Sequence, residues 1–210
     1  MNLFDLLPSI RDQGERDTCL SLALTDGHQV ARQSRQALSA EYLHFQASKR
    51  AGVELNQGVP VWAGRQALSA DGQPAEDACT YSAKARPAGW QLPPGITVLW
   101  RRETDLHPDR VSESVRHSLE RGRACVAVIR INDAFIHGSG SRSVIEDFMG
   151  PDRGVHAVLV VGILQEVTPA AFFVRNSWGT EWCVEGYGSL SESYLEARCV
   201  GVISYLEEVH

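Results

Sequence analysis

Several features that mark common protein classes are missing from this sequence. Its five cysteines include no CxxC pair and no cluster with histidine at zinc-ligand spacing, so we expect neither a metal nor a cofactor. The net charge of −6 comes without a run of lysine or arginine, which argues against nucleic acid or an anionic membrane as the main partner. A membrane-spanning helix needs about 18 consecutive apolar residues, and no window of the sequence approaches that pattern.

The length and composition suit one compact globular domain. A chain of 210 residues, 43% of them hydrophobic, can bury a substantial core in a unit of one or two lobes. The first residues, Met1–Pro8, have neither the basic start nor the apolar stretch of a secretory signal peptide. We therefore expect a protein that is not exported by that route.

Helical patterns dominate the first half of the sequence. Asp17 and Thr18 are favourable N-cap residues for a helix whose apolar positions follow at helical spacing. Cys19 then falls in the first turn, where the helix dipole stabilises a thiolate. Two further helices are expected, from Ser39 through Ala47 and from Pro60 to a stop at Asp71.

The second half has mainly the pattern of a sheet. It follows a proline- and glycine-rich stretch, Ala85–Gly95, which we interpret as a crossover between lobes. One helix, capped by Asp109 or Ser112 and ending at Gly122, comes first. Short β-branched runs then predict four strands: Cys125–Ile131, Ala157–Leu164, Phe172–Asn176 and Val200–Leu206. The long segment Asn132–Gly154 either borders the functional site or is mobile.

Three local signatures suggest a thiol nucleophile with its base. They are Gln13-Gly14-Glu15-Arg16-Asp17-Thr18-Cys19, Val155-His156-Ala157-Val158 and Asn176-Ser177-Trp178-Gly179-Thr180. A cysteine attacks a carbonyl as thiolate, so a histidine such as His156 must accept its proton. The side-chain amide of Asn176 would hold one ring nitrogen as donor and leave the other for the sulfur. The resulting oxyanion needs two donors, which the backbone N–H of Cys19 and the side chain of Gln13 can supply.

Together these signatures resemble the papain-like (C1-type) cysteine peptidases, over the span Ile10–Tyr194. The resemblance implies hydrolysis of peptide bonds through a covalent acyl-enzyme, with four catalytic residues: Cys19, His156, Asn176 and Gln13. It also implies an α+β, papain-like two-lobe fold in a single domain, 1–210. An N-terminal helical lobe, about 1–95, would carry the cysteine. A C-terminal antiparallel β-barrel-like lobe, about 96–210, would carry the histidine and asparagine, with the active-site cleft between the lobes.

The resemblance further implies a set of substrate-binding residues: Gly58, Val59, Pro60, Val155, Ala157, Trp178 and Trp182. Gly58, the one kept of a family pair of glycines, would present its backbone to an extended peptide. The four aliphatic residues would surround the side chain second from the scissile bond and favour an aliphatic or aromatic group there, although they are equally compatible with ordinary core packing. Trp178 would shield the hydrogen bond between histidine and asparagine, and Trp182 would line the leaving-group side.

Three departures from the family pattern are visible. Arg16 stands where most members have a disulfide cysteine, Leu20 replaces a tryptophan after the nucleophile, and Cys183 replaces a glycine. Cys125 and Cys199 lie in apolar runs typical of buried thiols. We therefore expect no structural disulfide and a reducing compartment: a cytoplasmic protein, or an effector delivered without a cleavable signal peptide.

Two other functions remain open. The same residues could serve an amidase, deamidase or transamidase effector that acts on one protein partner, or form a catalytically retired binding module. The expected partners are a peptide or protein substrate and a regulatory or target protein. Because no propeptide is visible before Cys19 in this sequence, we expect restraint from a narrow cleft, from the Asn132–Gly154 segment or from such a partner. Six histidines outside the signatures are expected at the surface: His28, His44, His107, His117, His137 and His210.

Overall fold

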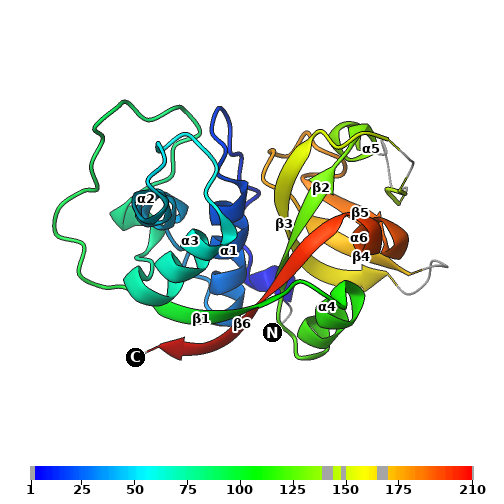
Figure 1. Cartoon of the computed structure of the whole chain (residues 1–210). Helices are drawn as coiled ribbons and strands as arrows, with labels where there is room; N and C mark the ends of the chain where they lie inside the picture. The colour runs from blue at the N-terminus through cyan, green and yellow to red at the C-terminus, as the bar shows by residue number, and fades with distance from the viewer. Residues whose placement is uncertain (1–2, 139–143, 148–149, 165–169, 210) are drawn as a thin grey trace. The chain divides into compact units, whose positions relative to one another are not determined.

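The computed structural model describes residues 3–138, 144–147, 150–164 and 170–209, and it combines helices with a six-stranded sheet (Figure 1). This mixture confirms the expected α+β class. The chain divides into two compact units, the first comprising Met1–Pro8, Gln13–Thr104 and Tyr205–His210, the second Ser9–Asp12 and Asp105–Ser204. The proline-rich stretch Ala85–Gly95 lies within the first unit, and the chain enters the main part of the second after Thr104.

The first unit is built on three helices: α1 (Cys19–Ala31), α2 (Ala40–Ala51) and α3 (Val61–Gln66) (Figure 1). Every residue from Leu20 to Val30 is buried, so other segments cover α1 on all sides. The two helices expected from Ser39 and Pro60 are present, with these residues as their N-caps. A π-helical turn, η2 (Ala67–Asp71), extends α3, and short 3-10 turns form η1 (Leu3–Leu6) and η3 (Glu76–Ala78).

Two histidines of the first unit are buried, and the prediction of a surface position for them is wrong. His28 and His44 are both 0% exposed. His28 Nδ1 donates to Gln73 Oε1 at 2.8 Å, while His44 Nε2 donates to the carbonyl of Leu55 at 3.0 Å and its Nδ1 accepts from the Ser21 hydroxyl at 2.9 Å. Burial lowers the pKa of His28 to about 3 and that of His44 to about 4. Both rings are therefore neutral core groups that sequence context alone did not reveal.

The sheet has the strand order β1-β6-β2-β3-β4-β5, and its strands are β1 (Arg101–His107), β2 (Cys125–Ile131), β3 (Gly154–Leu164), β4 (Ala171–Arg175), β5 (Tyr187–Ser191) and β6 (Cys199–Val209). The four predicted strands are thus confirmed as β2, β3, β4 and β6. Strand β1, in which charged residues interrupt the apolar pattern, was not predicted, and neither were the bounds of β5. Pairing of β2 with β3 is antiparallel and places Ile129 opposite His156.

Three helices accompany the strands of the second unit: α4 (Val111–Glu120), α5 (Asp133–His137) and α6 (Glu192–Arg198). Only α4 was predicted, and its N-cap is Arg110, so the expected cap by Asp109 or Ser112 is wrong. The segment Asn132–Gly154 contains α5 and, at Ile145, a bridge to Leu190 of β5. Arg198 of α6 binds two carboxylates of the same segment, Asp147 and Asp152. Within this segment residues 139–143 and 148–149 lie outside the described part of the chain, as does His210.

Two further findings concern only the residues described above. In those ranges, no helix has both the length and the apolar composition needed to cross a membrane. Over the same ranges, histidine, cysteine, aspartate and glutamate do not gather into a group of three or more that could hold a metal ion. All five cysteines fall in the described ranges, and the structure records each of them as a thiol.

Candidate active site

The segment Gln13–Cys19 leads into the first turn of α1. Gly14 has φ of +62°, and a Cβ there would come within 2.2 Å of the carbonyl oxygen of Ala83, so both the turn and the close approach require glycine. Cys19 is half-buried and is the first residue of the helix, as predicted. We call Gln13–Cys19 the nucleophile loop.

Thr18 occupies the N-cap position of α1, one of the two residues predicted for it, but its side chain makes no capping hydrogen bond. Its hydroxyl contacts the Tyr81 hydroxyl at 2.5 Å, and Tyr81 donates to the carbonyl of Gln13 at 3.0 Å. Because Tyr81 has one hydroxyl proton, Thr18 is the donor in the first of these bonds. The threonine side chain therefore connects the nucleophile loop to Tyr81.

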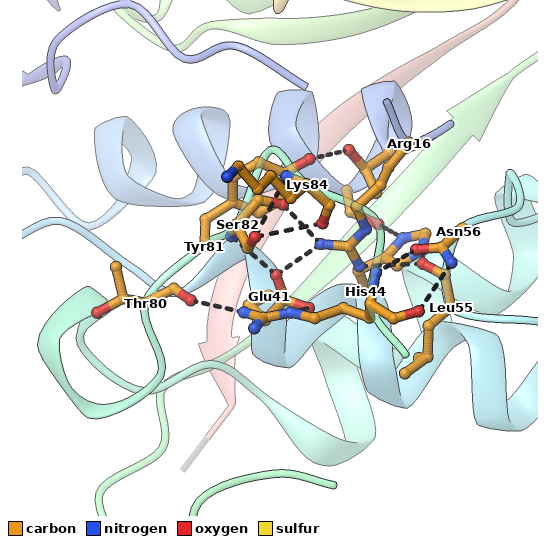
Figure 2. A network of polar contacts seen from close by, with 12 residues as sticks. Arg16, Glu41, His44, Leu55, Asn56, Thr80, Tyr81, Ser82 and Lys84 are labelled. Atoms are coloured by element: carbon orange, nitrogen blue, oxygen red, sulfur yellow. Dashed lines mark hydrogen bonds and ion pairs between the residues drawn. The ribbon is translucent and has the colours of Figure 1, made fainter. Parts of the chain in front are cut away.

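Gln13 and Arg16 hold the interior of the nucleophile loop. The Gln13 Nε2 group donates to the carbonyl of Arg16 at 3.0 Å, which uses one of its two hydrogens. Arg16 is 1% exposed, and its guanidinium binds Glu41 Oε2 at 2.7 Å (Figure 2). The position that holds a disulfide cysteine in most members of the resembled family is therefore filled by a buried ion pair.

The predicted substrate-binding residues of the first unit lie next to this loop. The backbone N–H of Asp17 donates to the carbonyl of Asn56 at 3.0 Å, and a Cβ on Gly58 would be 3.6 Å from the carbonyl oxygen of Asp17. Gly58 and Pro60 are exposed and Val59 is half-buried. The structure thus brings Gln13, Cys19 and the predicted backbone-binding glycine onto neighbouring segments.

His156 and Asn176 form a hydrogen-bonded pair in the second unit. His156, on β3, is 4% exposed, and its Nε2 lies 2.7 Å from Oδ1 of Asn176, which follows β4. The backbone N–H of Ser177 donates to the same Oδ1 at 2.8 Å, which identifies this atom as the oxygen. Nε2 of His156 must then be the donor, so Nδ1 of the neutral ring is a proton acceptor.

Aromatic rings surround this pair. The ring of Trp178 lies 4.5 Å from that of His156, and Phe135 lies 5.7 Å from it, centroid to centroid. Trp182 packs on Phe135 at 5.1 Å and donates its indole N–H to the carbonyl of Phe135 at 3.1 Å. Trp178 packs directly against the histidine ring, while Trp182 reaches the histidine through Phe135.

Burial determines the protonation state of this histidine. Removal from water lowers the pKa of His156 to about 4, and the hydrogen bond to Asn176, which raises it, offsets only part of that effect. At neutral pH the ring is therefore uncharged and its Nδ1 can accept a proton. No carboxylate contributes to this shift.

The two predicted substrate-binding residues that flank His156 differ in exposure. Val155 is 64% exposed, whereas Ala157 is 2% exposed. Ala157 therefore lies in the core of the unit, and Val155 offers an apolar side chain at the surface.

Phe135 was not identified from the sequence, although it contacts the histidine and both tryptophans. It lies on α5, inside the segment that the sequence analysis treated as a loop. The side chain of Asn132 caps that helix by accepting from the N–H of Phe135 at 3.1 Å. The sequence signal for this helix was an N-cap residue, Asn132, followed closely by the apolar pair Phe135-Ile136.

The comparisons with known proteins agree with these features. The model of the papain family cysteine proteases matches residues 6–201, so the chain belongs to this family. Peptidase 1 of Dermatophagoides pteronyssinus is 35% identical over 86 residues, which is 40% of this chain and 26% of that protein. Peptidase 1 of Psoroptes ovis is 30% identical over 112 residues, 52% of this chain and 34% of that protein. The matched region thus spans only about a quarter to a third of these curated relatives.

Solved structures confirm the papain-like fold. A digestive procathepsin L 3 of Tenebrio molitor larval midgut superposes with a TM-score of 0.77 at 19% identity, covering 97% of this chain and 68% of that one. Xylellain, a cysteine protease from Xylella fastidiosa, gives 0.74 at 20% identity, with coverages of 96% and 84%. At such identities the likeness establishes the fold alone.

Proposed function

We propose that the chain is a cysteine peptidase that hydrolyses peptide bonds through a covalent acyl-enzyme. The observation that carries the proposal is the His156–Asn176 pair, whose hydrogen bond leaves Nδ1 of a neutral, buried imidazole as a proton acceptor. Membership of the papain family and the position of Cys19 at the start of α1 support the same chemistry.

In this mechanism Nδ1 of His156 takes the proton of the Cys19 thiol, and the thiolate attacks the carbonyl carbon of the substrate. His156 then gives its proton to the leaving amine, and the acyl group stays on the sulfur as a thioester. Water attacks the thioester with His156 again as base, which releases the acid and restores the thiol. Asn176 carries no proton in any step and keeps the ring in one tautomer.

The oxyanion would be held by the backbone N–H of Cys19 and by Nε2 of Gln13. The Gln13 amide donates to the carbonyl of Arg16, which fixes the orientation of the amide.

Peptide side chains would be selected by the apolar surface of Val59, Pro60 and Val155, with Gly58 presenting its backbone. A charged group among these residues would lose hydration without gaining a partner. We further propose that a regulatory or target protein restrains or directs the enzyme.

The test uses two cysteine variants of similar exposure. Cys19→Ala should abolish release of product from a fluorogenic peptide, because the sulfur is the nucleophile, while the fold is retained. Cys183→Ala, which removes another half-buried thiol, should keep wild-type turnover. Near-normal turnover in Cys19→Ala would exclude the mechanism. Mass spectrometry of the products separates hydrolysis from transfer, since a transamidase would join the acyl group to an added amine in preference to water.

A further inference from the structure

We propose that a buried network of Arg16, Glu41 and Arg86 positions the nucleophile loop for catalysis. Its ion pairs would hold the loop in place at the position where most members of the family have a disulfide. The inference rests on the proposed function, because it assigns these residues a role in the same reaction. None of them touches the reacting atoms, so each is a positioning residue.

The guanidinium of Arg16 joins three separate segments of the first unit (Figure 2). Its Nη1 donates to Glu41 Oε2 on α2 at 2.7 Å and to the carbonyl of Ser82 at 3.0 Å, and its Nη2 donates to the carbonyl of Leu55 at 2.9 Å. The ring of Tyr81 lies 5.3 Å from the guanidinium carbon. One side chain therefore links the nucleophile loop to α2, to the segment before Gly58 and to the segment after η3.

Glu41 is the centre of the network. The side chains of Arg16 and Glu41 are each 0% exposed, and Arg86 Nε binds the second carboxylate oxygen of Glu41 at 3.1 Å. Burial alone would raise the pKa of the Glu41 carboxyl, but the hydrogen bonds from the two arginines outweigh it and lower that pKa. The carboxylate is thus ionised and fully paired, and removal of its charge would leave a buried guanidinium without compensation.

Arg86 connects the network to Asn56, Thr80 and Trp90. Its backbone N–H donates to Asn56 Oδ1 at 2.8 Å and its carbonyl accepts from Asn56 Nδ2 at 3.0 Å. Its guanidinium also donates to the carbonyl of Thr80 at 3.1 Å and stacks on Trp90 at 4.3 Å. Asn56 in turn accepts the N–H of Asp17 through its carbonyl, so the path returns to the nucleophile loop.

The backbone of Arg16 connects the network to the proposed oxyanion donor, Gln13. Its carbonyl is the acceptor that holds the Gln13 amide, and its side chain is the one that the network immobilises. A displaced Arg16 would therefore shift the Gln13 oxyanion donor. Errors of about 1 Å in such groups cost up to about 100-fold in rate. We expect the network to act on turnover through Gln13.

The experiment compares Glu41→Gln, which removes the charge and keeps the shape, with Asp71→Asn. Asp71 pairs with Arg50 of the same helix α2 through two hydrogen bonds, but its side chain is 24% exposed and lies outside the network. Glu41→Gln should lower kcat by about 10- to 100-fold with KM nearly unchanged, and Asp71→Asn should leave both constants as in the wild type. Normal kcat in a folded Glu41→Gln protein would overturn the proposal.

A double-mutant cycle distinguishes positioning from general stability. If Glu41 acts through Gln13, Glu41→Gln should have little further effect on kcat in a Gln13→Ala background. An equal fold-loss in both backgrounds would overturn the assignment. Arg16→Lys, which keeps the charge but fewer of its contacts, should fall between the wild type and Glu41→Gln. Should Glu41→Gln fail to fold, Arg86→Gln, at a partly exposed residue, serves in the same cycle.

One readout does not depend on peptidase activity. The backbone N–H groups of Glu15 and Asp17 donate to Ala83 and Asn56, so their hydrogen exchange reports on the loop. Both amides should exchange faster in Glu41→Gln than in Asp71→Asn. Equal exchange rates in the two variants would overturn the network's role. If these amides exchange faster in Glu41→Gln as expected, but the wild-type protein has no peptidase activity, only the proposed function would be overturned.

Discussion

The two groups of proposed catalytic residues are held by opposite kinds of interaction. The nucleophile loop is fixed by hydrogen bonds and a buried ionic network, in which Glu41 is paired with Arg16 and Arg86. The imidazole of His156 is fixed by one amide and by packed rings, with no carboxylate contributing to its pKa shift. The proposed mechanism would therefore be supported by charge in one unit and by packed apolar rings in the other.

Each solution fits the chemistry that it supports. The loop must hold polar donors in place, and ionic hydrogen bonds are strong and directional. The base must stay uncharged until it accepts a proton, and apolar surroundings favour the neutral ring. The first solution should therefore be sensitive to removal of charge, and the second to removal of volume.

The aromatic surroundings of His156 are tested most directly by Phe135→Ala. This ring is 0% exposed and contacts both tryptophans and the histidine, so its loss should lower the free energy of unfolding by about 3–5 kcal/mol. Urea unfolding measures this loss. Phe172→Ala, at another fully buried ring of the same core, should cost a similar amount without lowering kcat of the folded protein, whereas Phe135→Ala should lower both. Equal kcat in the two variants would remove Phe135 from the support of His156.

The polar contacts of the nucleophile loop are tested by Gln13→Ala. Loss of one oxyanion donor should lower kcat by about 10²–10³-fold while KM changes little. Unfolding free energy should stay close to that of the wild type, because the side chain is only half-buried. Gln66→Ala, at an exposed glutamine of α3, is the matched control. A rise in KM with normal kcat would show that Gln13 binds substrate and does not hold the oxyanion.

Both units share a dependence of stability on pH. His28, His44 and His156 have pKa values of about 3, 4 and 4 in the folded chain, against about 6.5 when unfolded. Between pH 6.5 and pH 4 the unfolded chain therefore binds more protons, so stability present above pH 6.5 is lost as the pH falls. The urea midpoint should already be lower at pH 5 than at pH 7.5. A constant midpoint over this interval would contradict the burial of these rings.

Local patterns in the sequence predicted much of the fold. The apolar β-branched runs identified β2, β3, β4 and β6, and the N-cap residues before α2 and α3 identified those helices. These signals lie within a few residues of the element they describe. The same holds for Asn176, which the Ser-Trp-Gly-Thr sequence after it singled out, and whose hydrogen bond to His156 the structure contains.

Features that depend on distant partners were not predictable in this way. Arg16 is separated by 25 residues from Glu41 and by 66 from Ser82, so nothing near it in the sequence indicates burial or pairing. The burial of His28 and His44 likewise depends on partners elsewhere in the unit. Thr18 favours a helix cap by its residue type, but the hydroxyl of Tyr81 competes for its side chain and prevails.

The acceptors of the buried network have a consequence for how the sequence can vary in evolution. Arg16 and Arg86 donate to Glu41, and the other hydrogen-bond acceptors of their guanidinium groups are the main-chain carbonyls of Leu55, Ser82 and Thr80, which any amino acid would provide. Substitutions at these three positions can therefore accumulate without loss of the contact, whereas the two arginines and the glutamate must be inherited together. An arginine at position 16 therefore needs only Glu41, itself paired with Arg86, as an ionic side-chain partner, because the peptide backbone supplies its other hydrogen-bond acceptors.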